Sequence, residues 1–184
     1  MKKLFPFVLV VLFLACDSDE NKAGRFLIKG NEALGKGDYN EAVRLYSEAI
    51  AKNDQYVEAY NNRGVANYKD GKYIEAIIDY TQILIQINPD FTEARRNRVN
   101  AYLDAGRYEK ALEDLVELER VFPDSAFVDF SRGLVYHEMK EFNLSIAAFE
   151  KSYEKDNSNP ETLVNVANGY YMIRDFDKAK KTLQ

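Results

Sequence analysis

The chain has 184 residues, and its 25 Lys and Arg against 30 Asp and Glu give a formal net charge of −5. An acidic balance argues against a nucleic-acid partner, because phosphates are bound by basic patches. The single cysteine excludes an internal disulfide, and a single histidine leaves no Cys/His cluster with the spacing of metal ligands.

Residues 1–15 differ from the rest of the chain. Lysines at positions 2 and 3 are followed by an apolar run that ends at Ala15, directly before the only cysteine, Cys16. A run of about a dozen apolar residues is too short to span a bilayer comfortably, and it is typical of an export signal. The junction resembles the bacterial lipobox, in which the cysteine is lipidated and becomes the new N-terminus. The alternative is an ordinary signal peptide followed by a free thiol.

Residues 16–22 are polar and acidic, and we interpret them as a tether that would reach roughly 20 Å if extended. Asp17 after the cysteine resembles an inner-membrane retention signal of enterobacterial lipoproteins. The cluster of Ser18 with acidic residues resembles a surface-export signal of Bacteroidetes lipoproteins. The sequence does not choose between these signals and simple solubilisation of the tether. We expect a lipid anchor in the bacterial cell envelope and favour the outer membrane. The sequence leaves open whether the protein lies on the periplasmic face or the surface face.

A short motif recurs five times, and its aromatic residues are 34, 35, 34 and 34 residues apart. These residues are Tyr39, Tyr73, Tyr108, Phe142 and Phe176. A fixed period in this range predicts stacked helical hairpins, each of which buries its apolar face against its neighbours. Such arrays usually hold partners along an extended surface rather than catalyse a reaction.

The turn inside each hairpin has its own signature. Gly37, Gly71 and Gly106 lie two residues before the aromatic residue, where glycine takes the left-handed conformation at low cost. Lys140 and Arg174 replace this glycine in the last two units, so we expect those turns to be strained or different in shape.

Two further columns complete the motif. In three of the units, the residue directly after the aromatic residue is Asn or Asp, and we expect it to cap the second helix of its hairpin. These residues are Asn40, Asn143 and Asp177. A second column on the first helix contains Gly30, Gly64, Val99, Gly133 and Ala167.

The pattern resembles that of the tetratricopeptide-repeat (TPR) family, which has a Gly and an aromatic residue on a first helix and small and aromatic residues on a second. The resemblance covers residues 23–184 and implies an all-α fold, a right-handed superhelical solenoid of helix-turn-helix hairpins. Four units are complete and a fifth is truncated. The expected bounds are 23–56, 57–91, 92–125, 126–159 and 160–184. From the early stop at Gln184 we expect either a fragment of a longer protein, which we favour, or a partner that covers this end.

The sequence holds no constellation that would support catalysis. His137 is interpreted as a surface or groove histidine, since no nucleophile–base pair or phosphate loop can be assembled around it. We therefore expect no enzyme activity, no cofactor, no metal site and no small-molecule substrate. Ser125 lies in a stretch that resembles the O-glycosylation motif of Bacteroidetes, but capping of the following helix is the preferred interpretation.

In this family, ligands mostly bind the concave surface that the first helices line. When the groove positions of the family are assigned to this sequence residue by residue, two columns of asparagine lie on this surface. One contains Asn62, Asn97 and Asn165, and the other contains Asn31, Asn100 and Asn168. Asparagine carries a donor and an acceptor, so it can pair with a peptide backbone without reading side chains. The alternative is that both columns are often asparagine in the family, where the amides only help to solvate or cross-link the helices.

The last two units offer apolar side chains beside the asparagines. We expect an apolar subsite for a helix or an aromatic-rich segment, made by Phe127, Phe130 and Tyr171 with Leu134, Val164 and Met172. The carboxylate clamp of the chaperone-binding family members is rejected. Its basic positions carry Leu27, Glu93 and Asn97, which leave little to hold a terminal carboxylate.

These features predict a non-catalytic adaptor: a lipid-anchored envelope protein that holds a protein or peptide segment in its concave groove. By resemblance, its setting is envelope assembly, secretion or motility machinery. The alternative is the extracytoplasmic sensor or interaction region of a longer signalling protein, which the coding sequence after Gln184 would distinguish.

Overall fold

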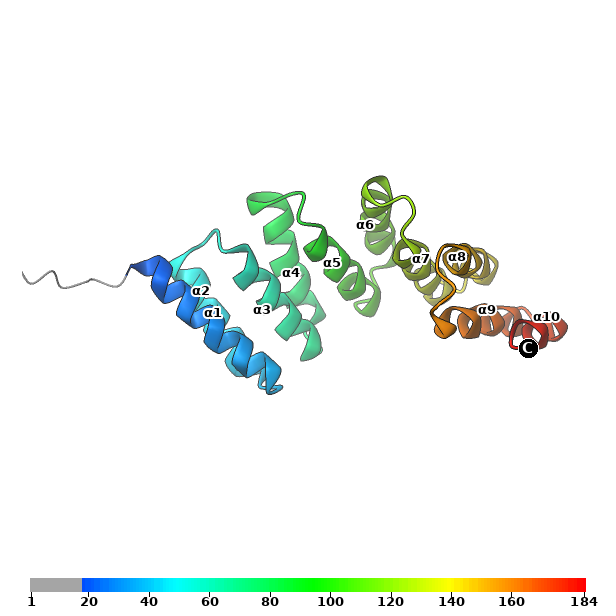
Figure 1. The fold of residues 1–184 in the computed structure, drawn as a ribbon, viewed down its shortest axis with the longest axis horizontal. Coiled ribbons are helices and arrows are strands. Elements are labelled where there is room, and N and C mark those ends of the chain that lie inside the picture. Colours follow the sequence, from blue (N-terminus) through cyan, green and yellow to red (C-terminus); the bar gives the residue numbers. More distant parts are fainter. Residues whose placement is uncertain (1–17) are drawn as a thin grey trace, which may run out of the picture.

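The structure is a computed structural model that describes residues 18–184, all of whose regular elements are helices (Figure 1). The predicted signal segment 1–15 and the predicted lipidation site Cys16 lie outside the described residues. In the described part, no helix is both long enough and apolar enough to cross a membrane. The prediction of an all-α solenoid is confirmed.

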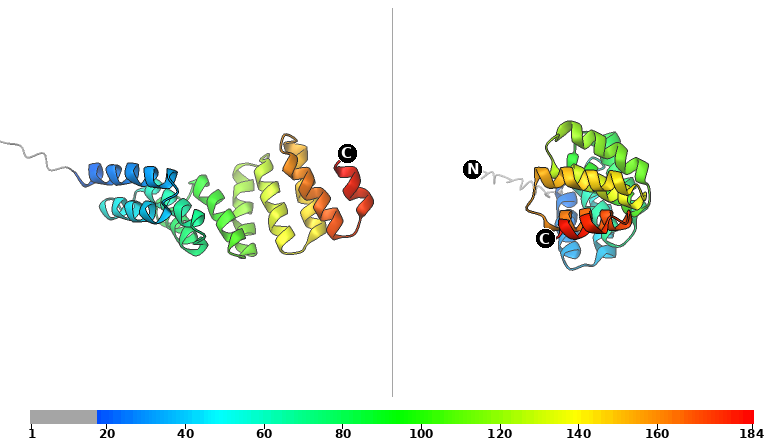
Figure 2. Two further views of the ribbon diagram at one scale, coloured as in Figure 1. Left: turned by 90° about the horizontal axis from the view of Figure 1, so that it is seen from below. Right: turned by 90° about the vertical axis from the view of Figure 1, so that its right-hand side faces the viewer.

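Five helix-turn-helix hairpins follow one another along the chain. The first helices of the hairpins are α1 (Asp19–Gly35), α3 (Val57–Lys69), α5 (Thr92–Asp104), α7 (Ala126–Glu138) and α9 (Pro160–Met172). The second helices are α2 (Tyr39–Lys52), α4 (Tyr73–Gln82) with a π-helical end η1 (Ile83–Ile87), α6 (Tyr108–Val121), α8 (Phe142–Lys155) and α10 (Phe176–Thr182). Each helix packs mainly against the next one in the chain, so the hairpins stack into an elongated array with α1 and α10 at opposite ends (Figures 1 and 2).

Helix α1 begins earlier than the sequence suggested. Ser18 is its N-cap, and its hydroxyl accepts a hydrogen bond from the backbone N–H of Asn21 at 3.2 Å. Asp19 and Glu20 add negative charge to the first turn, where the helix dipole favours it. Residues 19–22 are therefore helical rather than extended, and the first unit starts at Asp19 instead of residue 23.

The caps of the second helices were predicted two residues too late. The aromatic residue of each motif is itself the first helical residue, so Asn40, Asn143 and Asp177 lie inside the first turn. The capping side chains belong to the residue before the aromatic one. Asp38 accepts from the N–H of Glu41 at 3.2 Å, and Asp175 accepts from the N–H of Lys178 at 3.2 Å. The left-handed residue turns the chain so tightly that the next residue is already the cap.

The cap of α7 is only partly as expected. Ser125 occupies the N-cap position, but its side chain makes no capping hydrogen bond there.

All five turns inside the hairpins adopt the same backbone conformation. Gly37, Gly71 and Gly106 have φ of 77°, 75° and 68°, and Lys140 and Arg174 have φ of 63° and 66°. The last two turns therefore keep the common shape and carry left-handed strain, which costs an L-residue about 1–2 kcal/mol. The expectation of strain is confirmed, and that of a different shape is wrong.

The single 35-residue spacing also has a structural cause. Helix α4 and η1 together extend the second helix of the second unit to Ile87, one residue more than the 14 residues of α2, α6 and α8. The extra residue is absorbed by a π-helical turn, in which the N–H of Asn88 bonds to the carbonyl of Ile83 at 2.7 Å. The hairpin therefore stays in register with its neighbours.

Close approach between glycine and an aromatic ring holds each of three hairpins together. A Cβ atom at Gly64 would lie 2.6 Å from the ring of Tyr80, so only glycine lets the ring lie on the first helix. The same relation joins Gly30 to Tyr46 and Gly133 to Phe149. In the third unit both members change together: Val99 stands in the glycine column and Leu115 in the aromatic column, and both are fully buried.

Arginine side chains bridge consecutive hairpins on the face of the second helices. Arg63 donates to Ser47 Oγ on α2 at 3.0 Å and to Asp79 Oδ1 on α4 at 2.7 Å. One unit later, Arg98 makes the same pair of contacts, with Thr81 Oγ1 at 3.0 Å and Asp114 at 2.8 Å. Each guanidinium thus ties the second helix of one hairpin to the second helix of the next.

A third arginine in the same column contacts the preceding second helix but not the following one. Arg132 donates to Glu119 Oε2 on α6 at 2.8 Å and to Asp129 Oδ1 on its own helix at 3.2 Å. Lys151 and Lys155 of α8 contact the buried Asp129 at 3.1 and 2.6 Å, so this carboxylate joins three cations.

The fifth unit is the least covered part of the array. Helix α10 has 7 residues, of which none is buried, whereas α8 has 14. Leu183 is 61% exposed, although Phe149 at the equivalent position of the fourth unit is 1% exposed.

The strained turns generate the first prediction. Lys140→Gly should raise the free energy of unfolding by about 0.5–1 kcal/mol, because relief of left-handed strain exceeds the entropy that glycine adds to the unfolded chain. Gly71→Ala is the matched control, since an added Cβ there meets open space. The stability lost in this variant therefore reports on backbone conformation alone. Urea unfolding followed by circular dichroism measures both. A destabilised Lys140→Gly variant would show that the lysine side chain contributes more to stability than its left-handed backbone costs.

The coupled columns generate the second prediction. Gly64→Val should lower the free energy of unfolding by about 1–3 kcal/mol through overpacking against the ring of Tyr80. The double variant Gly64→Val with Tyr80→Leu copies the pair Val99 and Leu115 of the third unit. Its loss of unfolding free energy should be at least about 1 kcal/mol smaller than the sum of the losses in the two single variants. The double-mutant cycle is measured by denaturant unfolding. Strict additivity would contradict the proposed contact.

Candidate partner-binding groove

The predicted groove residues all lie on first helices. Asn31 is on α1, Asn62 on α3, Asn97 and Asn100 on α5, Phe127 and Phe130 on α7, and Asn165, Asn168 and Tyr171 on α9. Consecutive first helices from α1 to α7 contact one another, so this series forms a continuous surface in that part of the array.

The amides nearest the N-terminal end bond to each other. Asn62 donates from Nδ2 to Asn31 Oδ1 at 3.0 Å, and Tyr46 donates its hydroxyl to the same oxygen at 2.8 Å. Burial raises the pKa of Tyr46 to about 12, so this phenol stays protonated and remains a donor. The oxygen of Asn31 therefore accepts two hydrogen bonds inside the protein.

A second link involves a residue that the sequence interpretation missed. Asn61, which is buried on α3, accepts a hydrogen bond from Asn97 Nδ2 at 3.1 Å and donates to Glu93 Oε1 at 3.0 Å. Its position next to Asn62 was the available signal, because two adjacent amides on one helix can reach both neighbouring helices. The cross-linking alternative is thus observed for Asn31, Asn62 and Asn97. Asn62 and Asn97 each use one of two amide N–H groups in these bonds.

The same network explains why a carboxylate clamp cannot form here. Glu93 stands at one of its basic positions, and its carboxylate accepts from Asn61. Arg96 follows on the same helix, and its guanidinium lies 4.2 Å from the ring centroid of Phe127. Arg96 and Phe127 line a cleft of about 380 Å³ between the start of α5 and the α6–α7 turn. Asn100 is half-buried on the same helix.

The predicted apolar subsite is divided between core and surface. Phe130 is half-buried and packs edge-on against Phe149 with ring centroids 5.4 Å apart, so it also serves the hydrophobic core. Phe127 is half-buried against the central core cluster. A small cleft of about 220 Å³ lies between these two phenylalanines and the start of α9. Tyr171 is different, because it is 60% exposed.

A further cleft lies at the C-terminal end of the array. Asn165, Asn168 and Tyr171 line a cleft of about 570 Å³ together with apolar residues of α9 and α10, among them Val164, Phe176 and Leu183. Tyr171 and Phe176 form an edge-on pair with centroids 5.4 Å apart. The Nδ2 atom of Asn165 is buried and has no hydrogen-bond partner among the described residues. A buried donor without a partner costs free energy until a ligand supplies an acceptor.

His137 lies apart from this cleft. Its ring is half-buried and packs edge-on against Phe142 at 5.5 Å. Within residues 18–184, no group of three or more His, Cys, Asp or Glu is arranged to hold a metal ion.

Comparison with known proteins identifies the repeat. A tetratricopeptide-repeat family model matches residues 29–90 and 96–160. The chain belongs to the tetratricopeptide-repeat family. Proteins of this family are generally non-catalytic scaffolds that bind other proteins, so the coarse functional prediction agrees with family membership.

Individual relatives share the repeat rather than a whole-protein architecture. A tetratricopeptide repeat and J domain-containing co-chaperone of Cryptococcus neoformans is 31% identical over 157 residues, which is 82% of this chain but 30% of the co-chaperone. The structure of MamA from Desulfovibrio magneticus covers 88% of this chain and 91% of its own, with a TM-score of 0.80 and 20% identity. A tetratricopeptide repeat protein of Parabacteroides merdae covers 88% and 62%, with a TM-score of 0.78 and 20% identity. At this identity the two structures establish the fold alone.

Proposed function

We propose that this TPR array is an adaptor that binds a segment of a partner protein in its groove, without catalysis. The observation that carries the proposal is the buried, unpartnered Nδ2 of Asn165 at the edge of the apolar cleft on α9 and α10. A peptide carbonyl would satisfy this donor, while apolar side chains of the segment would cover Tyr171 and Leu183. This combination is the usual chemistry of a groove for a short segment.

The spacing of the first helices fits an extended segment along the groove. Packed helices lie roughly 8–10 Å apart, and an extended chain advances about 3.3–3.6 Å per residue. The remaining amide N–H groups of Asn62 and Asn97 would therefore meet about every third residue of such a segment. Phe127, with Arg96 stacked on its ring, would contact the segment between these amides and Asn165.

The proposal also places the array at a membrane. Supported by the lipobox-like junction at Ala15–Cys16, the lipid on Cys16 would hold the array in the bacterial cell envelope, with the outer membrane favoured. A multiply acylated cysteine exceeds the two-chain requirement for stable anchoring. Because α1 starts at Asp19, the link between the lipid and the first helix would be only Asp17 and Ser18, which keeps the array close to the bilayer.

A second candidate is the extracytoplasmic interaction region of a longer signalling protein. The exposed apolar residues Phe176 and Leu183 favour it, because a further helix of the same chain would cover them. The coding sequence that follows Gln184 distinguishes the two candidates: a membrane span and a signalling domain there would support the second.

Lipidation has a direct test. Cys16→Ser should move the protein from the membrane fraction to the soluble fraction, or leave the precursor uncleaved, since the acyl acceptor is lost. Fractionation and intact mass spectrometry of the wild type and the variant measure this. An unmodified thiol at Cys16 in the mature wild-type protein would contradict the anchor.

Groove binding is tested on the cleft residues themselves. Asn165→Ala combined with Tyr171→Ala should weaken binding of the native partner by about 10- to 100-fold, because a hydrogen bond and an aromatic contact are both lost. A photo-crosslinking residue at position 168 should capture the partner in cells, and the double change should abolish the capture. Position 78 on α4 is the matched control, since Ile78, like Asn168, is exposed but lies on a second helix.

Two outcomes separate binding from folding. Asn62→Ala removes a cross-link to Asn31 as well as a groove donor, so it should lower the free energy of unfolding in addition to affinity. The double change on α9 should leave the helicity of the array unchanged. Capture from position 78 but not from position 168 would overturn the groove assignment.

A further inference from the structure

The bridges between hairpins follow one rule at the first two junctions that contain arginine. In each, one guanidinium lies between a hydroxyl on the preceding second helix and a carboxylate on the following one: Ser47 and Asp79 around Arg63, and Thr81 and Asp114 around Arg98. The side chains of Arg63 and Arg98 are 23% and 12% exposed, so each guanidinium fills its junction. The cleft that remains beside Arg63 is about 250 Å³.

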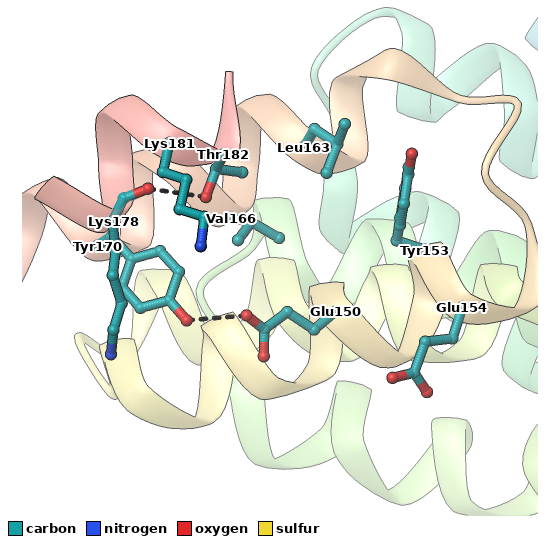
Figure 3. Close-up of a pocket in the computed structure, with 9 residues that line it drawn as sticks. All are labelled: Glu150, Tyr153, Glu154, Leu163, Val166, Tyr170, Lys178, Lys181 and Thr182. Atoms are coloured by element: carbon teal, nitrogen blue, oxygen red, sulfur yellow. Dashed lines mark hydrogen bonds between the residues drawn. The ribbon is translucent and has the colours of Figure 1, made fainter. Parts of the chain in front are cut away.

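The last junction lacks this arginine. Val166 stands at the same position of α9, ten residues before the aromatic residue of its motif, and it is buried at the floor of a cleft. The cleft lies between α8, α9 and α10 and measures about 510 Å³, twice the space beside Arg63 (Figure 3). It opens on the opposite face of α9 from the groove, because Leu163, Val166 and Tyr170 recur at helical spacing on that side.

The acceptors of the guanidinium are nevertheless present, with their positions exchanged. Glu150 on α8 stands where Ser47 and Thr81 stand in the earlier junctions, and Thr182 on α10 stands where Asp79 and Asp114 stand. The last junction thus keeps one carboxylate and one hydroxyl on opposite walls (Figure 3). Glu150 is held in place by Tyr170, whose hydroxyl donates to Oε1 at 2.8 Å.

We propose that this cleft is a binding site for an arginine side chain of a partner protein, which would supply in trans the guanidinium that the earlier junctions carry internally. The planar guanidinium donates in several directions, so it can bond to Glu150 and Thr182 together. Glu154, on the wall of α8, adds negative potential at the entrance. The site is separate from the groove, and its occupation does not depend on groove binding.

The wall formed by α10 limits the affinity of the cleft for a guanidinium. Lys178 and Lys181 also line the cleft, and both are cations. Lys178 is paired with Asp175 at 3.3 Å and lies over the ring of Tyr170 at 5.1 Å, which reduces its effect on a ligand. Lys181 is the cation that most directly opposes a guanidinium. Its removal should therefore strengthen binding, which a site for an anion would not show.

The probe for the test is N-acetyl-arginine methylamide, with the citrulline analogue as its neutral isostere. In NMR titrations of the full chain, the arginine probe should shift resonances of α8, α9 and α10 with a Kd of about 1–10 mM, the range for a ligand of this size. The citrulline probe should bind at least about 10-fold more weakly, because the charge-assisted hydrogen bonds are lost. Equal binding of the two probes, or shifts elsewhere, would overturn the proposal.

Variants of the cleft give independent tests. Val166→Arg places a guanidinium in the cleft while Glu150 is unchanged. The internal guanidinium should occupy the site and abolish the shifts caused by the probe. Glu150→Gln should weaken the probe by about 3- to 10-fold, and Lys181→Ala should strengthen it by about 2- to 3-fold, as expected for partly exposed charges. Circular dichroism checks that each variant keeps its helicity. Glu150→Gln and Lys181→Ala change surface residues only, so they decide the question even if Val166→Arg does not fold. Unchanged probe affinity in both would overturn the site.

Discussion

The contact between a glycine on a first helix and an aromatic ring on a second helix is the constraint on which the rest of the array depends. It sets how closely the two helices of a hairpin approach, as at Gly64 and Tyr80. It also lets a ring reach across the hairpin to the opposite surface. The hydroxyl of Tyr46 arrives in this way at Asn31, so a core residue fixes a groove amide. The core and the binding surface are therefore parts of one structure.

Polar bridges between hairpins supply register rather than large stability. Buried ion pairs such as Arg63 with Asp79 gain attraction and lose hydration in similar amounts, so their net contribution is small. Burial in fact raises the pKa of Asp79, although Arg63 and Asn67 bond to it. What the bridges enforce is position, since a hairpin shifted by one residue would bury an unpaired charge. The hydrogen bond from Asn97 to Asn61 acts similarly on the groove side, between two uncharged amides.

Much of this could be predicted from the 34-residue period, because the period places every column on a known side of a hairpin. The five hairpins and the left-handed turns followed from it, whereas the groove face was expected only from the resemblance to the family. The caps were misplaced because the sequence does not show that the residue after a left-handed position is already the N-cap. The role of Asn61 and the arginine bridges were missed because they join different units. Arg63, Arg98 and Arg132 share one column, and comparison of columns across units would have found them.

The fifth unit combines three departures from the pattern, and they explain why both proposed sites meet there. Val166 replaces the bridging arginine, Asn165 has a donor without a partner, and Leu183 is uncovered. Each change removes an internal contact that earlier units possess, so each leaves a surface that gains free energy when a ligand covers it. A unit with fewer internal contacts also opens more easily than the central ones. Binding along such an end would therefore order the last hairpin and complete the same contacts that the repeat makes internally elsewhere.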